Sequence, residues 1–157
     1  MPKRSAGLLL YRLTNGRPEV FLVHPGGPYW AKKDDGAWSI PKGEYTDDEE
    51  PLAAARREFE EETGIRPEGE ATLLGTIRQP GGKLVTAFAV EGDVDPDAIR
   101  SNTFSMEWPP RSGRMRSFPE VDRAGWFGKE EAERKILRGQ LPLLEALWER
   151  LGSARHS

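Results

Sequence analysis

The sequence has no cysteine and only two histidines, His24 and His156, among its 157 residues. Without cysteine there is no disulfide framework, no thiolate metal site and no cysteine nucleophile. This composition is compatible with a reducing compartment, and we expect a cytoplasmic location. No second histidine lies near His24 in the sequence, so we predict a strand-end residue there rather than a metal ligand.

Long apolar runs and an excess of positive charge are also missing. No segment approaches the roughly 20 apolar residues that a membrane span requires. The short apolar run near the start is interrupted by Arg12 and is typical of a strand. The formal net charge of −3 gives no overall basic surface, so we expect no binding to duplex nucleic acid. Any nucleotide would have to be held by local groups.

The length of the chain fits one domain over residues 1–157, with a frayed tail at residues 152–157. Two apolar segments flank an Asn-Gly pair and predict a hairpin, and the Gly- and Pro-rich segment 25–38 predicts a loop. The expected strands are 5–13, 19–24, 71–78, 84–91, 103–108 and 119–127, and the expected helices are 51–63, 128–140 and 141–151. The pattern indicates a protein with both helices and strands.

The segment 43–65 concentrates carboxylates on one short helix. At about 100° per residue, Glu58, Glu61 and Glu62 fall within an arc of roughly 100°, whereas Glu60 points elsewhere and is expected to be solvated. Leu52, Ala55 and Phe59 form a neighbouring core-packing face. Ala54 lies inside the carboxylate arc, where a small side chain would leave room for an ion. One side of the helix is therefore predicted to pack and the adjacent side to bind a cation.

An acidic, solvated helix face is the alternative for such a pattern. Like charges three and four residues apart repel, and the helix dipole disfavours anions near the C-terminus, so a bound cation would remove both penalties. Pro51 at the first turn and Gly64 after the last give the helix defined ends. Glu50, at the expected N-cap, is a poor capping residue.

This segment resembles the signature of the Nudix hydrolases: a glycine, five residues, Glu, seven residues, then Arg-Glu-apolar-x-Glu-Glu-x-Gly-apolar. The matching positions are Gly43, Glu49, Arg57, Glu58, Phe59, Glu61, Glu62, Gly64 and Ile65. The flanking chain is similar in outline, through WSIPKG before the signature and PEVDRAGWF late in the sequence. The resemblance implies an α/β/α sandwich with a mixed sheet and helices on both faces. It also implies a divalent-metal pyrophosphohydrolase acting on a nucleoside diphosphate linked to another group.

The resemblance and the helix geometry together suggest roles for the acidic residues. Glu58 and Glu62 are the first-choice metal ligands, and the resemblance implies that the Gly43 carbonyl is a third. Glu61 is expected to act as the general base or to bind a second ion. Mg²⁺ suits these oxygen ligands because it keeps waters and bridges phosphate oxygens, and Mn²⁺ could replace it.

Other residues are expected to support this site. Arg57 lies four residues before Glu61 and is placed to orient that carboxylate. By resemblance, Glu49 supports Arg57 rather than binding metal. Glu120 is the candidate ligand from late in the chain, with Glu44 and Glu107 behind it.

Candidate substrate contacts lie outside the signature. The segment 109–119, expected to be a loop, carries Arg111, Arg114 and Arg116, which could grip a polyphosphate; an exposed basic loop is the alternative. Lys42 would balance the acidic helix or touch a phosphate. Trp30 could stack a base or only cover the sheet edge.

The expected substrate is a small nucleoside polyphosphate, with a dinucleoside polyphosphate favoured because WSIPKG resembles the segment found in some dinucleoside polyphosphate hydrolases. Oxidised nucleoside triphosphates, nucleotide sugars and capped RNA are alternatives. Two other classes are a non-catalytic Nudix-fold nucleotide sensor and an acidic domain without a ligand. The complete signature argues against the sensor.

Overall fold

The computed structural model describes the backbone of residues 3–156 and the side chains of residues 3–152. A six-stranded mixed sheet has the order β4-β5-β1-β2-β8, with β3 paired to β1. Only β1 and β5 run parallel among these neighbours. The strands are β1 Arg4–Thr14, β2 Arg17–Pro25, β3 Lys42–Glu44, β4 Ala71–Arg78, β5 Leu84–Glu91 and β8 Val121–Gly128.

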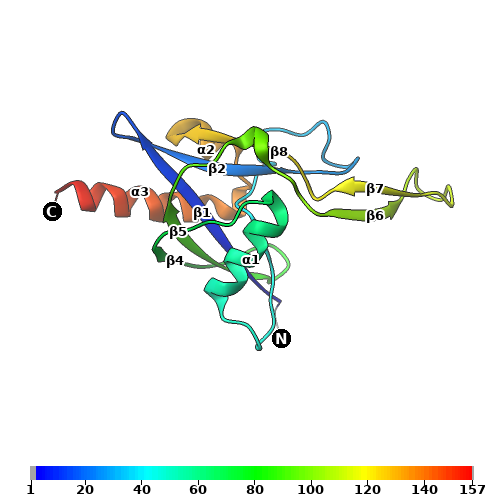
Figure 1. Cartoon of the computed structure of the whole chain (residues 1–157), viewed down its shortest axis with the longest axis horizontal. Helices are drawn as coiled ribbons and strands as arrows, with labels where there is room; N and C mark the ends of the chain where they lie inside the picture. The colour runs from blue at the N-terminus through cyan, green and yellow to red at the C-terminus, as the bar shows by residue number, and fades with distance from the viewer. Residues whose placement is uncertain (1–2, 157) are drawn as a thin grey trace.

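Helices cover both faces of this sheet, as Figure 1 shows. α1 (Pro51–Thr63) lies on one face, and α2 (Lys129–Lys135) and α3 (Leu141–His156) lie on the other. The short 3-10 helices are η1 (Pro96–Ala98) and η2 (Arg138–Gln140). A separate hairpin of β6 (Thr103–Glu107) and β7 (Met115–Pro119) projects from the sandwich. The predicted α/β/α sandwich with a mixed sheet is confirmed.

The alternation of side chains along β1 builds the two cores. Leu8 and Leu10 pack with Phe59 of α1, whereas Leu9 packs with Leu144 of α3 on the opposite face. All of these side chains are buried. Each such burial contributes about 1.5–3 kcal/mol relative to exposure, so both helical layers are held by the same strand.

The first hairpin forms where the Asn-Gly pair predicts it. Asn15 and Gly16 have φ values of 54° and 78°, the left-handed pair that a two-residue hairpin turn needs. β1 and β2 pair directly up to this turn, with Thr14 opposite Arg17. The two strands then diverge toward the other end of the sheet.

The segment 38–44 fills the gap between the diverging strands. Ser39 exchanges hydrogen bonds with Val23 of β2 at 2.9 and 3.0 Å, and Leu8 of β1 donates to the Pro41 carbonyl at 3.2 Å. β3 then continues along β1, with Gly43 opposite Ala6. The WSIPKG segment therefore lies between β1 and β2, and it places Gly43 next to α1.

The bounds of α1 agree with the prediction. Gly64 ends the helix in the left-handed conformation, φ 76°, and donates to the Glu60 carbonyl at 2.7 Å. Glu50 makes no side-chain cap, as its residue type suggested. The expectation for Ala54 is wrong: its side chain is buried in the core with Leu8 and Phe59, so it leaves no space for an ion.

Two further predictions need correction. The helix expected over 128–140 ends at Lys135, because the next residue, Ile136, is extended and pairs with Trp38 of the 38–44 segment. The tail expected to fray from residue 152 instead continues α3 to His156, and Ser157 lies outside the described residues.

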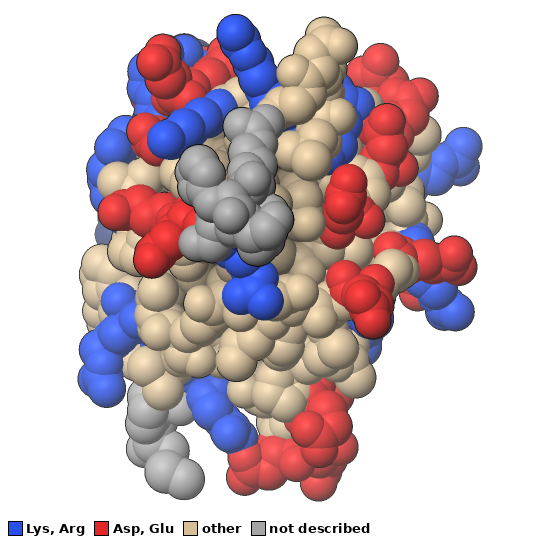
Figure 2. Space-filling model, turned by 90° about the vertical axis from the view of Figure 1, so that its left-hand side faces the viewer, with Lys and Arg blue, Asp and Glu red and all other residues tan. Residues whose placement is uncertain are grey.

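The charged surface agrees with the small net charge. On the face shown in Figure 2, lysine and arginine are interspersed with aspartate and glutamate around a mostly uncharged centre, and the described residues form no extended basic patch there. Within the described part of the chain, no helix has the length and apolar character needed to cross a membrane.

Candidate active site

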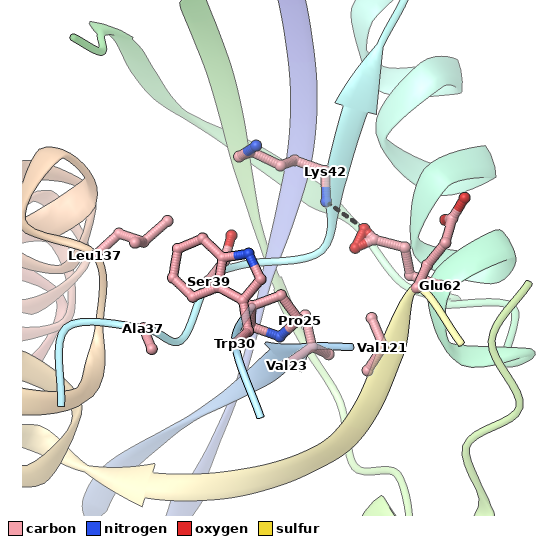
Figure 3. Close-up of a pocket in the computed structure, with 10 residues that line it drawn as sticks. Val23, Pro25, Trp30, Ala37, Ser39, Lys42, Glu62, Val121 and Leu137 are labelled. Atoms are coloured by element: carbon pink, nitrogen blue, oxygen red, sulfur yellow. Dashed lines mark hydrogen bonds between the residues drawn. The ribbon is translucent and has the colours of Figure 1, made fainter. Parts of the chain in front are cut away.

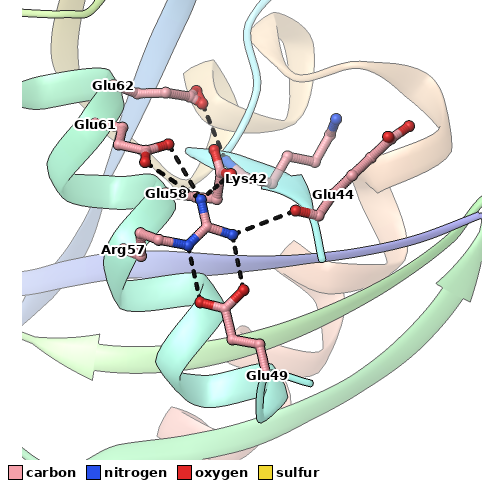
Figure 4. Close-up of polar contacts among 7 residues, drawn as sticks. All are labelled: Lys42, Glu44, Glu49, Arg57, Glu58, Glu61 and Glu62. Atoms are coloured by element: carbon pink, nitrogen blue, oxygen red, sulfur yellow. Dashed lines mark hydrogen bonds and ion pairs between the residues drawn. The ribbon is translucent and has the colours of Figure 1, made fainter. Parts of the chain in front are cut away.

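The acidic face of α1 points toward β3 and the segment before it. Figure 4 shows Glu58, Glu61 and Glu62 gathered on this side of the helix. Glu60 lies away from them and accepts a hydrogen bond from Arg66 at 3.1 Å. The helical phase deduced from the sequence therefore describes the helix correctly.

Arg57 is the centre of a carboxylate network (Figure 4). Its Nε and Nη2 donate to the two carboxylate oxygens of Glu49 at 2.8 and 2.9 Å. Its Nη1 donates to Glu58 at 2.7 Å and to both oxygens of Glu61 at 3.2 and 3.3 Å. The expected Arg57–Glu61 and Glu49–Arg57 contacts are both present, and the contact with Glu58 was not anticipated.

This network sets the charge state of its members. The hydrogen bonds from Arg57 lower the pKa of Glu49. In turn, the hydrogen bonds with Glu49 and Glu58 raise the pKa of Arg57. Arg57 is thus a permanent cation that fixes the directions of Glu58 and Glu61 from behind.

Gly43 and Lys42 bring backbone groups to the same carboxylates. A side-chain carbon at Gly43 would collide with the carboxylate of Glu58 in this arrangement, so any other residue there would turn Glu58 aside. The Lys42 amide donates to Glu62 Oε2 at 3.2 Å. The signature glycine therefore lets the Glu58 carboxylate lie directly against the backbone of β3.

Burial makes the two inner carboxylates difficult to ionise. It raises the pKa of Glu62 to about 8, and the negative charges of Glu58 and Glu120 act in the same direction. Burial also raises the pKa of Glu58, with Glu61 and Glu120 adding to the effect while Arg57 opposes it. A divalent cation would relieve both penalties by supplying opposite charge.

Glu120 reaches this cluster from the junction of β7 and β8. Three backbone hydrogen bonds fix the junction: Asn102 donates to the Glu61 carbonyl at 2.9 Å, Glu120 to the Asn102 carbonyl at 2.8 Å, and Gly26 to the Glu120 carbonyl at 2.9 Å. Residues far apart in the sequence thereby meet at the end of α1.

The two alternative candidate ligands, Glu44 and Glu107, lie differently from Glu120. Glu44 is turned toward Lys3 and Lys83, at 3.8 and 3.4 Å. Glu107 is exposed on the hairpin. Of the three candidate late or flanking ligands, only Glu120 lines a cavity with Glu62.

That cavity, which we call the acidic cavity, has a volume of about 230 Å³ and is drawn in Figure 3. Trp30 lines it, and its ring also packs against the core cluster that includes Trp38. Lys42 lines it too, but its ammonium extends away from Glu62, whose contact is with the Lys42 amide (Figure 3). Burial lowers the pKa of this lysine.

Arg111 and Arg114 lie in a loop, as the sequence suggested, whereas Arg116 does not. Residues 115–119 form strand β7, so Arg116 lies in a strand, while Arg111 and Arg114 lie in the connection from β6. All three are exposed. Arg116 stands opposite Met106, and its guanidinium lies 5.6 Å from the centre of the Phe118 ring. β6 and β7 pair over five positions. The Pro-Pro pair in the connection between them indicates the end of a strand and gives no sign that a second strand follows.

His24 has a structural role, consistent with the expectation that it is not a ligand. Its buried ring donates from Nε2 to the Lys33 carbonyl at 2.6 Å, and Nδ1 lies 2.8 Å from Asp122 Oδ1. Trp38 packs edge-on against the ring at 5.2 Å between centroids. His24 therefore ties the 25–38 loop to β8.

The side chains offer oxygen ligands that fit a hard divalent cation. Glu58, Glu62 and Glu120 converge, and the Gly43 backbone packs against Glu58. Among the side chains of residues 3–152, no three histidine or acidic groups stand in metal-binding geometry, and Arg57 engages Glu58 and Glu61.

Sequence reasoning missed several residues near the acidic cavity. Phe104 and Met106 of β6, together with Gly26 and Gly27, surround a second cavity that also includes Trp30. The signal was present in the alternation of apolar residues along 104–108 and in the Gly-Gly pair. The two features could not be assigned to one cavity, because nothing in the sequence shows that residues 104–108 lie beside the Gly-Gly pair.

The fold and these side chains define an α/β/α sandwich whose first helix presents carboxylates to a cavity beside a threaded glycine segment. A family model described as NUDIX domain matches residues 1–147. The chain belongs to the Nudix family, so the resemblance seen in the signature is confirmed. At the level of the family, the expected enzyme class is also confirmed: a hydrolase acting on phosphoanhydride bonds.

Similar sequences include proteins named RNA pyrophosphohydrolase. The one from Aeromonas hydrophila is 28% identical over 149 residues, covering 81% of this chain and 85% of that protein. The one from Bartonella henselae is 37% identical over 68 residues, covering 41% of this chain and 36% of that protein. The latter match spans about a third of that relative's length.

Similar solved structures show the fold. The NUDIX domain of Shewanella oneidensis NrtR, complexed with ADP ribose, has a TM-score of 0.66 at 17% identity, covering 96% of this chain and 89% of that one. A C. elegans Ap4A hydrolase binary complex has a TM-score of 0.65 at 23% identity, covering 95% and 98%.

Proposed function

We propose that this protein is a Mg²⁺-dependent pyrophosphohydrolase that cleaves a phosphoanhydride bond in a nucleoside polyphosphate. The observation that carries the proposal is the electrostatic coupling of Glu62 to Glu58 and Glu120 beside Gly43, with Glu62 and Glu120 lining one cavity. Such a set is unfavourable without a cation, because Glu58 and Glu62 are partly buried and the three carboxylates repel one another. The proposal includes a cytoplasmic location, one domain and a small-molecule substrate.

The metal site would use Glu58 and Glu62 with the Gly43 carbonyl, and Glu120 would complete it from the junction of β7 and β8. When bound, Mg²⁺ would neutralise the charge of the phosphate oxygens and lower the pKa of a coordinated water. Mn²⁺ could replace it. Loading the site would displace the proton that burial holds on Glu62.

Glu61 is the proposed general base. Arg57 contacts its two carboxylate oxygens at 3.2 and 3.3 Å and so fixes the direction from which it can accept a proton from the attacking water. Arg57 itself is positioned by the paired contacts with Glu49. We keep a second ion at Glu61 as the alternative role.

Substrate phosphates would lie in the acidic cavity, with Lys42 and Trp30 on its wall. Arg116 is the best placed of the three proposed hairpin arginines, because it stands opposite Met106, a residue of the adjoining cavity. Arg111 and Arg114 are proposed as weaker contacts. Lys42 and the three arginines would provide local positive charge in a chain whose net charge is −3.

A dinucleoside polyphosphate is the first substrate class proposed, supported by the WSIPKG segment and by the structural similarity to an Ap4A hydrolase. RNA with a 5′-polyphosphate is the second, because several relatives are named RNA pyrophosphohydrolase. A panel of Ap4A, a 5′-triphosphorylated RNA oligonucleotide, an oxidised nucleoside triphosphate and ADP-ribose tests both. Products separated by ion exchange, with and without Mg²⁺, identify the cleaved bond.

The same panel separates the enzyme from a nucleotide sensor. Cleavage that depends on Mg²⁺ supports the proposal. Binding of a panel member without any cleavage in Mg²⁺ or Mn²⁺ contradicts it and supports the sensor. Neither binding nor cleavage of any member contradicts both.

A further inference from the structure

A second cavity of about 500 Å³ adjoins the acidic cavity, and we call it the ring pocket. The two cavities share Pro25, Trp30 and Glu120. Apart from Glu120, the ring pocket is lined by proline, glycine, aromatic and thioether groups. Its lining residues are Pro25, Gly26, Gly27, Pro28, Tyr29, Trp30, Phe104, Met106 and Glu120.

The ring pocket is built where the 25–30 loop meets the β6–β7 hairpin. A side chain at Gly26 would collide with the Pro119 carbonyl, and one at Gly27 would come within 2.9 Å of Phe104 Cζ. Gly27 also has a φ of 96°, which disfavours other residues. These two glycines let the hairpin approach closely enough to close the pocket.

The hairpin presents one apolar face to this pocket. Phe104 and Met106 are half-buried and line it, whereas the alternating residues Ser105 and Glu107 are exposed on the other face. At the far end, the rings of Tyr29 and Trp108 meet edge-on at 5.3 Å. The pocket therefore has aromatic and sulfur-containing walls although it opens to solvent.

We propose that the ring pocket binds the planar heterocyclic base of the nucleotide whose phosphates lie in the acidic cavity. The inference rests on the proposed function, because it places the phosphates at Glu62 and Glu120. A volume of about 500 Å³ falls within the range of small-molecule sites. Flat, polarizable walls favour stacking on the face of a ring.

The composition of the walls also determines selectivity. Glu120 is the only charged side chain among the lining residues, and it lies at the junction with the acidic cavity. With few side-chain groups to read the edge of a base, stacking dominates, and stacking accepts every base. The pocket should distinguish nucleotides from sugar phosphates strongly and one base from another weakly.

Binding of AMP and of ribose 5-phosphate to the intact protein tests this inference without requiring hydrolysis. Both probes carry one phosphate, and only AMP carries a base. Isothermal titration calorimetry with Mg²⁺ present should show AMP binding at least about tenfold more tightly, the scale of one stacking contact. CMP and GMP should bind within about fivefold of AMP, since stacking tolerates every base.

Two hairpin variants and a matched control localise the effect. Phe104→Leu keeps apolar volume but removes the ring, and Met106→Ala removes the thioether; each should lower AMP affinity at least about threefold without changing that of ribose 5-phosphate. Met115→Ala is the control, because Met115 is 67% exposed and stands opposite Glu107, on the other face of the hairpin. It should bind AMP as the parent does.

Two results would overturn the ring pocket. One is AMP binding no more tightly than ribose 5-phosphate, including no binding of either at millimolar concentration. The other is parental AMP affinity in both Phe104→Leu and Met106→Ala. Base-dependent binding without any hydrolysis would instead contradict the enzyme and leave the ring pocket supported, so the two failures are distinguishable.

Discussion

Arg57 holds Glu49 through two parallel hydrogen bonds, at 2.8 and 2.9 Å, and uses its remaining nitrogen to contact Glu58 and Glu61. Glu49 precedes α1, and Arg57 lies in its second turn, so the contact joins the loop before the helix to its acidic face. The direction of the proposed base is thereby set by a residue that need not touch substrate.

Replacing Arg57 tests this positioning role. Arg57→Lys keeps the charge but cannot make the forked contact with Glu49. Loss of a residue that orients metal ligands typically reduces metal affinity or activity about 10- to 100-fold. We expect a rise in the Mg²⁺ concentration for half-maximal rate and a fall in kcat, with KM changing little.

Arg56→Lys is the matched control. The neighbouring Arg56 donates to the Pro67 and Gly69 carbonyls, away from the carboxylates. Its replacement should leave kcat and the Mg²⁺ requirement within twofold of the parent. Equal kinetic losses in the two variants would show that Arg57 acts only through the stability of α1.

The proposed metal ligands give a second prediction. Glu58→Gln and Glu62→Gln should each lower kcat/KM at least about 100-fold, because removing a ligand charge weakens the stabilisation of the phosphate oxygens. Glu60→Gln should be nearly silent, since Glu60 faces Arg66 instead. Mg²⁺-dependent product formation measures all three, and parental turnover by either ligand variant would remove that residue from the site.

Much of this arrangement follows from the sequence because α1 is a local structure. The spacing of Phe59 and Ala55 and the end at Gly64 fixed the helical phase, and with it the shared face of the three carboxylates. Ala54 shows the limit of that reasoning. It lies near the edge of the arc, and the position of the sheet, which the helix pattern does not contain, decided that it packs inward.

Features that depend on long-range pairing could not be predicted in the same way. Glu120 was one of three acidic candidates until the hydrogen bonds through Asn102 and Gly26 placed it. The sequence pattern predicts a loop for Met115 and Arg116, because strand β7 forms only through pairing with β6. Ile136 is likewise outside the helix predicted for it, because it pairs with the distant Trp38.

The raised pKa of Glu62 predicts how the stability of the metal-free protein depends on pH. Below the ordinary glutamate range, Glu62 is protonated in both the folded and unfolded states and contributes no pH dependence. As the pH rises toward 8, the unfolded chain loses this proton while the folded chain retains it. The free energy of unfolding should therefore fall over this interval, by at most about 1.4 kcal/mol per pH unit from this group.

Urea unfolding in the presence of a chelator measures this dependence. Glu62→Gln should show a flatter profile and exceed the parent in stability most at pH 8, with the difference shrinking toward pH 5. Saturating Mg²⁺ should reduce the pH dependence of the parent, since the cation favours the ionised carboxylate. A parental profile in Glu62→Gln would mean that another group controls the stability.

His24 provides a prediction about stability. His24→Phe fills similar space but leaves the Lys33 carbonyl and the Asp122 carboxylate without their buried partner. We expect a loss of about 1–3 kcal/mol in the free energy of unfolding. Urea unfolding followed by tryptophan fluorescence measures it, and Thr76→Val, which breaks an exposed hydroxyl pair, is a control expected to change stability by less than about 0.5 kcal/mol.

The hairpin arginines give the last prediction. Arg116 stands opposite Met106 of the ring pocket, whereas Arg111 lies in the turn with a φ of 63°. Well-formed contacts between guanidinium and phosphate contribute about 1.5–3 kcal/mol, so Arg116→Ala should lower the specificity constant by about one to two powers of ten. Arg114→Ala should have a smaller effect, and Arg111→Ala the smallest. Measured at low and high salt, the loss for Arg116 should be greater at low salt, because salt screens an exposed contact. Values for all three variants within a factor of two of the parent would assign these side chains to the solvated surface.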